Sequence, residues 1–210
     1  MGAWLIPSPK LELREGEIHV WRRRRVISGS TGPRAGGGTL SRLLSLYTGQ
    51  PEKSIQLAKS EHGKPFLPDS DLQFNLSHSV DLALYAFARG RDVGVDVERE
   101  SRKVKAIEIA ERFFSESERE YLRQLPEEQL PVAFLRTWTR KEALLKALGT
   151  GIAGGLNRFS VAPEVERAFD LPVLGAPEWS LWDLPAGEGY AGALVSRPGP
   201  VRLRLFHCAG

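Results

Sequence analysis

Three acidic side chains are placed where they could bind a metal ion together. Asp96 and Glu98 lie two residues apart in the hexamer VGVDVE, which alternates valine with other residues. This alternation is typical of a β-strand, and it would put both carboxylates on one face of the strand. Glu142 lies further along the chain, in a stretch with the apolar spacing of a helix. Magnesium prefers oxygen ligands together with water and phosphate oxygens, so these three carboxylates predict a magnesium site.

Two lysines flank Glu142 and could serve the same site. Lys141 precedes it directly and Lys146 follows about one helical turn later, so both could hold a phosphate as point charges. Spacing alone also allows a purely structural interpretation. Asp96 and Glu98 could form the solvent face of an edge strand. Glu142 and Lys146 could be an i,i+4 helix pair that contributes roughly 0.2–0.5 kcal/mol.

Five ordered motifs resemble those of the 4'-phosphopantetheinyl transferase superfamily, of the surfactin (Sfp) type. They are Gly63-Lys64-Pro65, Asn75 to Ser79 (NLSHS), Gly94 to Glu98 (GVDVE), Arg112 to Glu118 (RFFSESE) and Trp138 to Lys146 (WTRKEALLK). The family signature combines a G-[IV]-D strand with a W-[ST]-x-K-E-[AS]-x-x-K helix some forty residues later, and both parts occur here in order. Each motif alone would be a weak signal, but all five in order favour a functional site over the structural interpretation.

The resemblance implies an enzyme of the holo-acyl-carrier-protein synthase type. Such an enzyme moves the phosphopantetheine arm of coenzyme A to a serine of an apo carrier protein and releases 3',5'-ADP. It implies that Asp96, Glu98 and Glu142 bind Mg²⁺ on the pyrophosphate, where the metal neutralises charge that develops during transfer. A serine hydroxyl is a weak nucleophile that needs a base. The resemblance implies Glu142 as that base, acting directly or through water.

Further motif residues would hold the coenzyme. The resemblance implies coenzyme contacts for Lys64, Ser77 and His78, with His78 favoured at the 3'-phosphate. Lys141 and Lys146 would contact phosphates, and Lys146 belongs to the catalytic set. The adjacent Ser77 and His78 could also suggest a hydrolase, but the chain has no G-x-S-x-G motif, and adjacent residues rarely act on each other as nucleophile and base.

Glu118 has two interpretations that are compatible with each other. Together with Ser115 it forms a capping-box pattern at the start of a helix. The resemblance implies a functional acid at this position, so Glu118 is also a candidate catalytic residue. Trp138 is expected in the core, where it could also shape the site.

The elements that would position these residues indicate an α+β fold. Strands are expected within 11–21, 72–76, 93–98, 158–162, 179–182, 190–195 and 201–206, and helices over 40–47, 104–114, 115–125 and 131–148. Residues 82–88 fit either a buried strand or a short helix. The resemblance implies a pseudo-dimer of two similar α+β halves, each an antiparallel sheet with packed helices. We expect an N-terminal half at 1–93 with coenzyme contacts, a C-terminal half at 94–210 with the metal site and catalytic helix, and the active site at the seam.

The first half departs from the family pattern over residues 22–39. Four arginines, Arg22 to Arg25, precede a stretch rich in glycine and serine where the family pattern has a longer helix. A natural deletion that leaves a loop, or a reading-frame error, would explain such a truncated first half. An impaired family member that only binds coenzyme A is therefore the alternative to an active transferase. Arg34 and Arg42 are candidate basic contacts.

Composition fits a chain with an anionic partner. The 210 residues carry a net charge of +3, a mildly basic balance that suits an acidic acyl or peptidyl carrier protein. The single cysteine, Cys208, excludes an internal disulfide, and no apolar run approaches the length of a membrane span. We expect a monomer, because two halves in one chain can build the seam. We also expect a cytoplasmic protein with neither membrane nor nucleic-acid partners. A nucleic-acid-binding protein is the remote alternative, suggested by Arg22 to Arg25.

Overall fold

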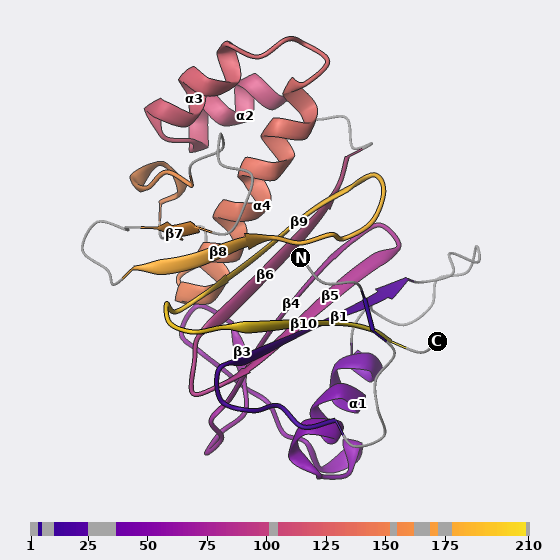
Figure 1. Ribbon diagram of the computed structural model, residues 1–210. Helices are drawn as coiled ribbons and strands as arrows, with labels where there is room; N and C mark the ends of the chain where they lie inside the picture. Colours follow the sequence, from indigo (N-terminus) through magenta and orange to yellow (C-terminus); the bar gives the residue numbers. More distant parts are fainter. Residues whose placement is uncertain are drawn as a thin grey trace.

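The computed structural model describes residues 4–5, 11–24, 37–100, 105–151, 155–161, 169–171 and 178–208. Within these residues the chain forms two four-stranded sheets, a short hairpin and four α-helices, which confirms the expected α+β class (Figure 1). Most of the atypical segment 22–39, including Arg34, lies outside the described residues. Arg42 lies in α1 (Gly37–Thr48).

The first sheet combines strands from both ends of the chain. Its order is β10-β1-β5-β4, with bounds Arg202–His207, Glu17–Arg24, Leu82–Arg89 and Leu72–Ser79. β1 pairs with β10 in parallel, and the other pairs are antiparallel. Helix α1 covers one face through an apolar cluster that includes Leu44 and Tyr85. The strand candidates 82–88 and 201–206 are thus strands, and the last of them joins the N-terminal sheet.

The second sheet is antiparallel throughout and carries the long helix. Its order is β6-β9-β8-β7, with bounds Val93–Arg99, Tyr190–Ser196, Trp179–Asp183 and Phe169–Leu171. Helix α4 (Leu130–Leu148) packs on this sheet through a cluster that contains Leu144, Trp179 and Val195. Pro131 lies in its first turn, and Gly149 ends it in the left-handed conformation with φ 74°.

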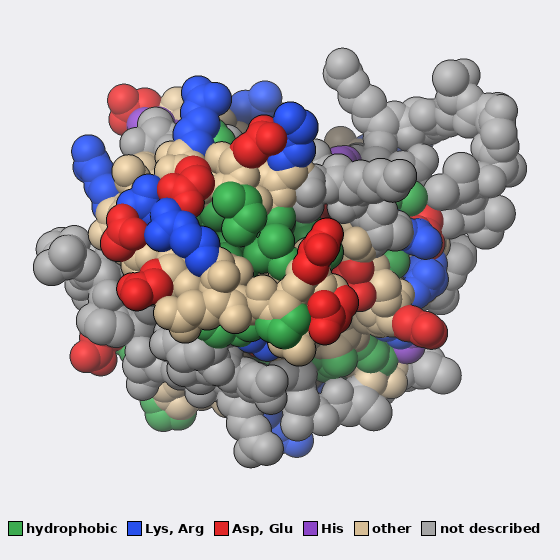
Figure 2. Space-filling model, turned by 90° about the horizontal axis from the view of Figure 1, so that it is seen from above, with side chains coloured by type: hydrophobic (Ala, Val, Ile, Leu, Met, Phe, Trp, Pro, Cys, Tyr) green, Lys and Arg blue, Asp and Glu red, His purple; other side chains and the backbone are tan. Residues whose placement is uncertain are grey.

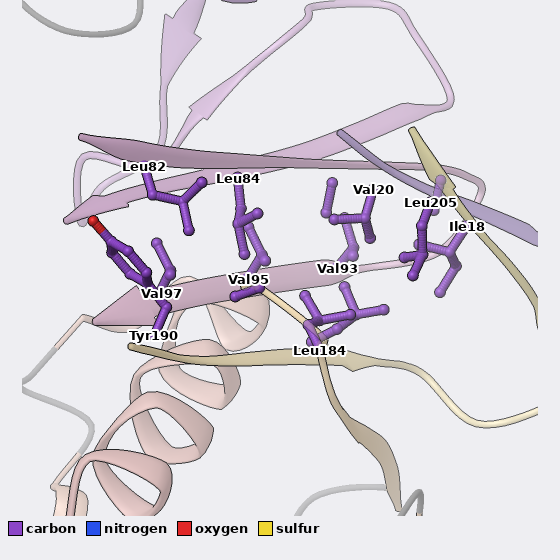
Figure 3. Close-up of a cluster of buried hydrophobic side chains, with 14 residues drawn as sticks. Ile18, Val20, Leu82, Leu84, Val93, Val95, Val97, Leu184, Tyr190 and Leu205 are labelled. Atoms are coloured by element: carbon purple, nitrogen blue, oxygen red, sulfur yellow. The ribbon is translucent and has the colours of Figure 1, made fainter. Parts of the chain in front are cut away.

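The inner faces of the two sheets share one apolar core. Figure 3 shows Leu82 and Leu84 from the first sheet, lying opposite Val95 and Val97 of β6. Because both layers contribute to this cluster, separating the sheets would expose apolar side chains on each of them. Strand β5 is buried on both faces, which explains its continuous apolar run.

Helices α2 (Ala106–Phe113) and α3 (Glu116–Arg123) form a hairpin at the top of Figure 1. The expected capping box is present, because the Glu118 carboxylate accepts a hydrogen bond of 2.9 Å from the Ser115 backbone N–H. The shorter elements are the hairpin strands β2 (Ala58–Lys59) and β3 (Pro65–Phe66), and the 3₁₀ turns η1 (Glu52–Ser54) and η3 (Leu156–Arg158).

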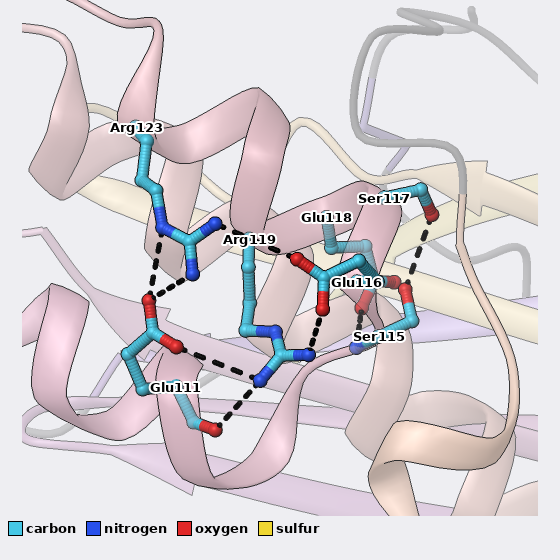
Figure 4. Close-up of polar contacts among 7 residues, drawn as sticks. All are labelled: Glu111, Ser115, Glu116, Ser117, Glu118, Arg119 and Arg123. Carbon is cyan, nitrogen blue, oxygen red and sulfur yellow. Dashed lines mark hydrogen bonds and ion pairs between the residues drawn. The ribbon is translucent and has the colours of Figure 1, made fainter.

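Ion pairs connect α2 to α3 at the surface. Arg119 and Arg123 of α3 both bind Glu111 of α2, and both also pair with Glu116 (Figure 4). These ion pairs together hold the hairpin at its exposed side, although exposed ion pairs contribute little individually. Figure 2 looks onto this side of the molecule and shows apolar side chains gathered in the middle of the face, with charged side chains around them.

The strand expected within 158–162 was wrong for its described part. Leu156–Arg158 is a 3₁₀ turn, and residues 159–161 pair with no strand. Their backbone groups bond instead to buried side chains of α3 and α4: the Phe159 carbonyl accepts from Lys141, and the Val161 N–H donates to Glu118. Because the backbone is satisfied by these side chains, the segment needs no neighbouring strand.

Candidate active site

Strands β4 and β6 lie at the facing edges of the two sheets and are joined by side chains. Three residues on one face of β4 bond to β6: Asn75 to the Val95 N–H (2.9 Å), Ser77 to Asp96 (2.7 Å) and Ser79 to Glu98 (2.8 Å). The partner positions advance together along both strands, so the two edges run parallel. We call this contact the polar seam.

Strand β6 presents its two acidic side chains to the polar seam. The alternation expected from the sequence is confirmed, since Val93, Val95 and Val97 enter the shared core while Asp96 and Glu98 bond to β4. Asp96 is only 4% exposed. Burying a carboxylate in this way requires partners that supply hydrogen bonds or positive charge.

Helix α4 brings Glu142 and Lys146 to the same place by lying directly on β6. A Cβ added at Gly94 would lie 2.1 Å from the Ala143 carbonyl oxygen and 2.4 Å from the Ala147 backbone nitrogen. Only glycine permits this approach, which explains why the motif begins with that residue. The Lys146 ammonium then reaches Asp96 Oδ1 at 2.6 Å.

These side chains line an open pocket of about 410 Å³. Its lining combines β4, β6 and α4: Leu76, Ser77, His78, Asp96, Glu98, Trp138, Glu142 and Lys146. All of these except Leu76 are candidate site residues predicted from the sequence. The pocket therefore brings together the three carboxylates proposed for the metal with Lys146, Ser77 and His78.

Burial and the neighbouring negative charges disfavour the ionised forms of Asp96 and Glu142. Burial raises the pKa of Asp96, and the Lys146 ammonium and the Ser77 hydroxyl partly oppose this. Burial also raises the pKa of Glu142, and the negative charges of Asp96 and Glu98 raise it further. Like charges in a partly dry site favour protonation or the binding of a cation.

Two carboxylate oxygens of the pocket have no hydrogen-bond partner among the residues that the structure describes. They are Asp96 Oδ2 and Glu142 Oε1, and both are buried. Among the described residues no group of three or more His, Cys, Asp or Glu side chains is already arranged to hold a metal ion. Mg²⁺ usually keeps water and phosphate oxygens in its shell, so the protein needs to supply only part of its ligands. The two unpartnered oxygens fit such a partial set of ligands.

Trp138 lies both in the core and at the pocket. Its ring stacks on Phe134 with centroids 6.1 Å apart and meets Phe113 edge-on at 6.3 Å. It also lines the pocket. The expected core role is thus confirmed, and the aromatic cluster fixes the ring as one wall of the pocket.

Lys141 and Glu118 lie together, but outside the residues that line the pocket. Both are fully buried, and the Lys141 ammonium lies 2.7 Å from Glu118 Oε2. The same ammonium donates to the Leu156 and Phe159 carbonyls at 2.7 and 2.6 Å. An ammonium group has three donors, and all three are engaged in this arrangement. The structure thus gives Lys141 and Glu118 a structural environment, and their predicted roles with phosphate and in catalysis stay predictions.

Lys64 also lies outside the pocket lining. Its ammonium donates to the Val93 and Ala147 carbonyls at 3.3 and 3.2 Å, and burial lowers its pKa. Ala147 lies in the last turn of α4, where a cation interacts favourably with exposed carbonyls. Lys64 therefore connects the hairpin strands β2 and β3 to the C-terminal end of α4. Its predicted coenzyme contact stays a prediction.

The seam partners Asn75 and Ser79 were not predicted from the sequence, although both lie in the NLSHS motif beside Ser77 and His78. The signal was available, because polar residues at alternate positions of a strand share one face. Arg140 of α4 was not predicted either; it is fully buried and makes a bidentate contact with Asp183 at 2.8 and 2.6 Å.

Comparison with known proteins gives one family. The family model described as the 4'-phosphopantetheinyl transferase superfamily matches residues 92–195. The 4'-phosphopantetheinyl transferase HetI of Nostoc sp. (strain PCC 7120) is 34% identical over an alignment 229 positions long, which includes gaps and covers 91% of this chain and 92% of that protein.

Other matches cover less of each chain. The 4'-phosphopantetheinyl transferase Sfp of Bacillus subtilis (strain 168) is 35% identical over 111 residues, or 52% of this chain and 48% of that protein. The crystal structure of Thermotoga maritima holo-acyl-carrier-protein synthase matches with a TM-score of 0.33 and 24% identity, over 50% of this chain and 61% of that chain. The chain thus spans nearly all of HetI and about half of Sfp. The family assignment rests on the sequence matches.

Proposed function

The chain belongs to the 4'-phosphopantetheinyl transferase superfamily, and on this premise we propose that it moves the phosphopantetheine arm of coenzyme A to a serine of an apo carrier protein. The observation that carries this proposal is the pocket at the polar seam. There the carboxylates of Asp96, Glu98 and Glu142 meet the Lys146 ammonium. Carboxylates and an ammonium around an open pocket suit a pyrophosphate substrate with a divalent cation.

Mg²⁺ is the proposed metal, and Asp96, Glu98 and Glu142 are its proposed ligands. Bound there, the ion would supply positive charge to the pyrophosphate and so stabilise the charge that develops during transfer. The unpartnered oxygens of Asp96 and Glu142 support this set.

Glu142 is also the proposed general base. Burial and the neighbouring carboxylates raise its pKa, which brings the group closer to the range where a base works well near neutral pH. The side chain would accept the proton of the carrier serine directly or through one water. Its Oε1 atom has no hydrogen-bond partner in the described part of the chain, so it is available for such a contact.

Lys146 and His78 are the proposed phosphate contacts within the pocket. Lys146 already neutralises Asp96 across 2.6 Å, and its side chain is 27% exposed. His78 is exposed at the pocket wall on β4. His78 lies on β4 of the first sheet and Lys146 on α4, which packs on the second sheet, so a phosphate between them would bridge the polar seam.

The proposed partners are coenzyme A and an acyl or peptidyl carrier protein. We also propose a monomer, because residues of β4, β6 and α4 from one chain line the pocket. The location that we propose is the cytoplasm, as expected from the sequence. Among the described residues no helix is long and apolar enough to cross a membrane. Arg22, Arg23 and Arg24 each contact other groups of the protein, which gives the arginine run a structural explanation without a nucleic-acid partner.

The test is a transfer reaction read by intact mass. The purified protein is incubated with coenzyme A, Mg²⁺ and a panel of apo carrier proteins, and parallel reactions omit Mg²⁺ or use Asp96→Ala and Glu142→Ala. The proposal expects a phosphopantetheine mass gain that all three controls abolish. A protein that binds coenzyme A but modifies no carrier would instead be the impaired family member.

A further inference from the structure

Ser79 is a buried serine of β4 whose hydroxyl both donates and accepts a hydrogen bond. It donates to Glu98 Oε2 at 2.8 Å and accepts a hydrogen bond of 3.1 Å from the Arg99 backbone N–H. A serine hydroxyl has one proton, so its only donor is directed to Glu98. The Arg99 backbone N–H bonds to a lone pair of the Ser79 oxygen and therefore fixes the rotation of the hydroxyl group.

The bond from Ser79 crosses between the two sheets. Glu98 projects from β6, and its side chain has three torsions that a ligand would otherwise have to immobilise. Ser77 makes the matching bond to Asp96 Oδ1 two residues earlier on β4. The first sheet therefore supplies one hydroxyl to each of the two acidic side chains on β6.

We propose that Ser79 is a positioning residue that orients Glu98 as a ligand of the divalent cation. This inference rests on the proposed function and deepens it, since Ser79 would set the metal affinity of the site without touching the coenzyme. Hydrogen-bond partners of metal ligands commonly act in this way, because they hold the ligand in its binding orientation before the metal arrives.

Ser196 offers a matched control within the same protein. It is a fully buried serine on β9, in the same sheet as Glu98, and its hydroxyl has no hydrogen-bond partner among the described residues. Ser196→Ala removes the same atom from another buried strand position, but it removes no bond to a metal ligand. Ser79→Thr keeps the hydroxyl and serves as the rescuing variant.

The test titrates Mn²⁺ calorimetrically into the full chain, with and without coenzyme A, and follows urea unfolding in parallel. Ser79→Ala should lower the Mn²⁺ affinity about 10- to 100-fold, whereas Ser79→Thr and Ser196→Ala should keep the wild-type affinity. In a Glu98→Gln background, Ser79→Ala should cause no further loss, because its effect passes through Glu98.

Three results would overturn the proposal. They are an unchanged Mn²⁺ affinity in Ser79→Ala, a further loss in the Glu98→Gln background, and a wild-type protein that binds no Mn²⁺. The carrier-transfer assay is read separately. A wild-type protein that binds Mn²⁺ but modifies no carrier would contradict the proposed function, while the comparison between Ser79→Ala and Ser196→Ala would still decide the role of Ser79.

Discussion

Lys141 and Lys146 lie on one helix and belong to one motif, but their ammonium groups have different surroundings. Lys146 lines the pocket and pairs with Asp96. Lys141 is fully buried and pairs with Glu118; burial lowers its pKa and the carboxylate of Glu118 opposes this. Sequence alone could not separate the two, because positions five apart on a helix differ by about 140° in direction, and only packing shows which direction is interior.

We predict that Lys141→Met will destabilise the fold by about 3–5 kcal/mol, because it leaves the Glu118 carboxylate buried without its cation. The double variant Lys141→Met/Glu118→Gln should recover a large part of this loss, since Gln carries no charge. Urea unfolding measures both free energies. If Lys141→Met kept wild-type stability but bound coenzyme A more weakly, Lys141 would instead contact the coenzyme, as the family resemblance implies.

Glu142 should oppose stability while it serves function. An acid whose pKa is raised on folding binds its proton more tightly in the folded state than in the unfolded state. Such a group therefore destabilises the fold as the pH rises above its ordinary pKa of 4.5. Glu142→Gln should therefore unfold at a higher temperature than the wild type at neutral pH without metal. The difference should shrink as the pH falls through the raised pKa toward that ordinary value.

The same substitution should lower transfer activity by about 10²–10⁴-fold, because it removes the proposed base. Thermal unfolding across this pH range and the carrier assay at neutral pH measure the two effects. A Glu142→Gln protein that is less stable than the wild type at neutral pH would show that the ionised carboxylate is favourable in the pocket.

At the scale of elements, the contact between α4 and β6 decides where the helix residues point. Much of this contact could be predicted, because the GVDVE strand and the WTRKEALLK helix carry clear periodicities. The close approach at Gly94 could not, since a glycine in a strand indicates only that something comes near. The local pattern around Phe159 predicts a strand, but the backbone there bonds to buried side chains of α3 and α4, which a local pattern does not reveal.

We predict that Gly94→Ala will destabilise the protein by about 1–3 kcal/mol or more. The added Cβ meets backbone atoms of Ala143 and Ala147, and a backbone cannot rotate away as a side chain could. Gly38→Ala is the matched control, because a Cβ at Gly38 in α1 has no neighbour within 4 Å and alanine favours a helix. Comparable stabilities for the two variants would contradict the close packing of α4 on β6.

At the scale of the whole molecule, the two sheets depend on each other. The position of the site at the seam could be expected from the family pattern. The pairing of β10 with β1 could not, because β10 comes from the far end of the sequence. Pairing between distant segments leaves no local signal, because the residue pattern of a strand does not specify which other strand it pairs with. The proposed halves 1–93 and 94–210 are therefore joined by a strand as well as by the polar seam.

We predict that residues 1–93 will not fold alone. This fragment would leave β1 without β10, and it would expose the core face that Leu82 and Leu84 share with β6. Circular dichroism should show no cooperative unfolding of the fragment, whereas the full chain should unfold in a single transition. Mixing it with residues 94–210 should restore cooperative unfolding, because that fragment returns β10 and β6. A cooperative transition in 1–93 alone would mean that the first sheet is stable without the second, and that the seam only aligns two independent units.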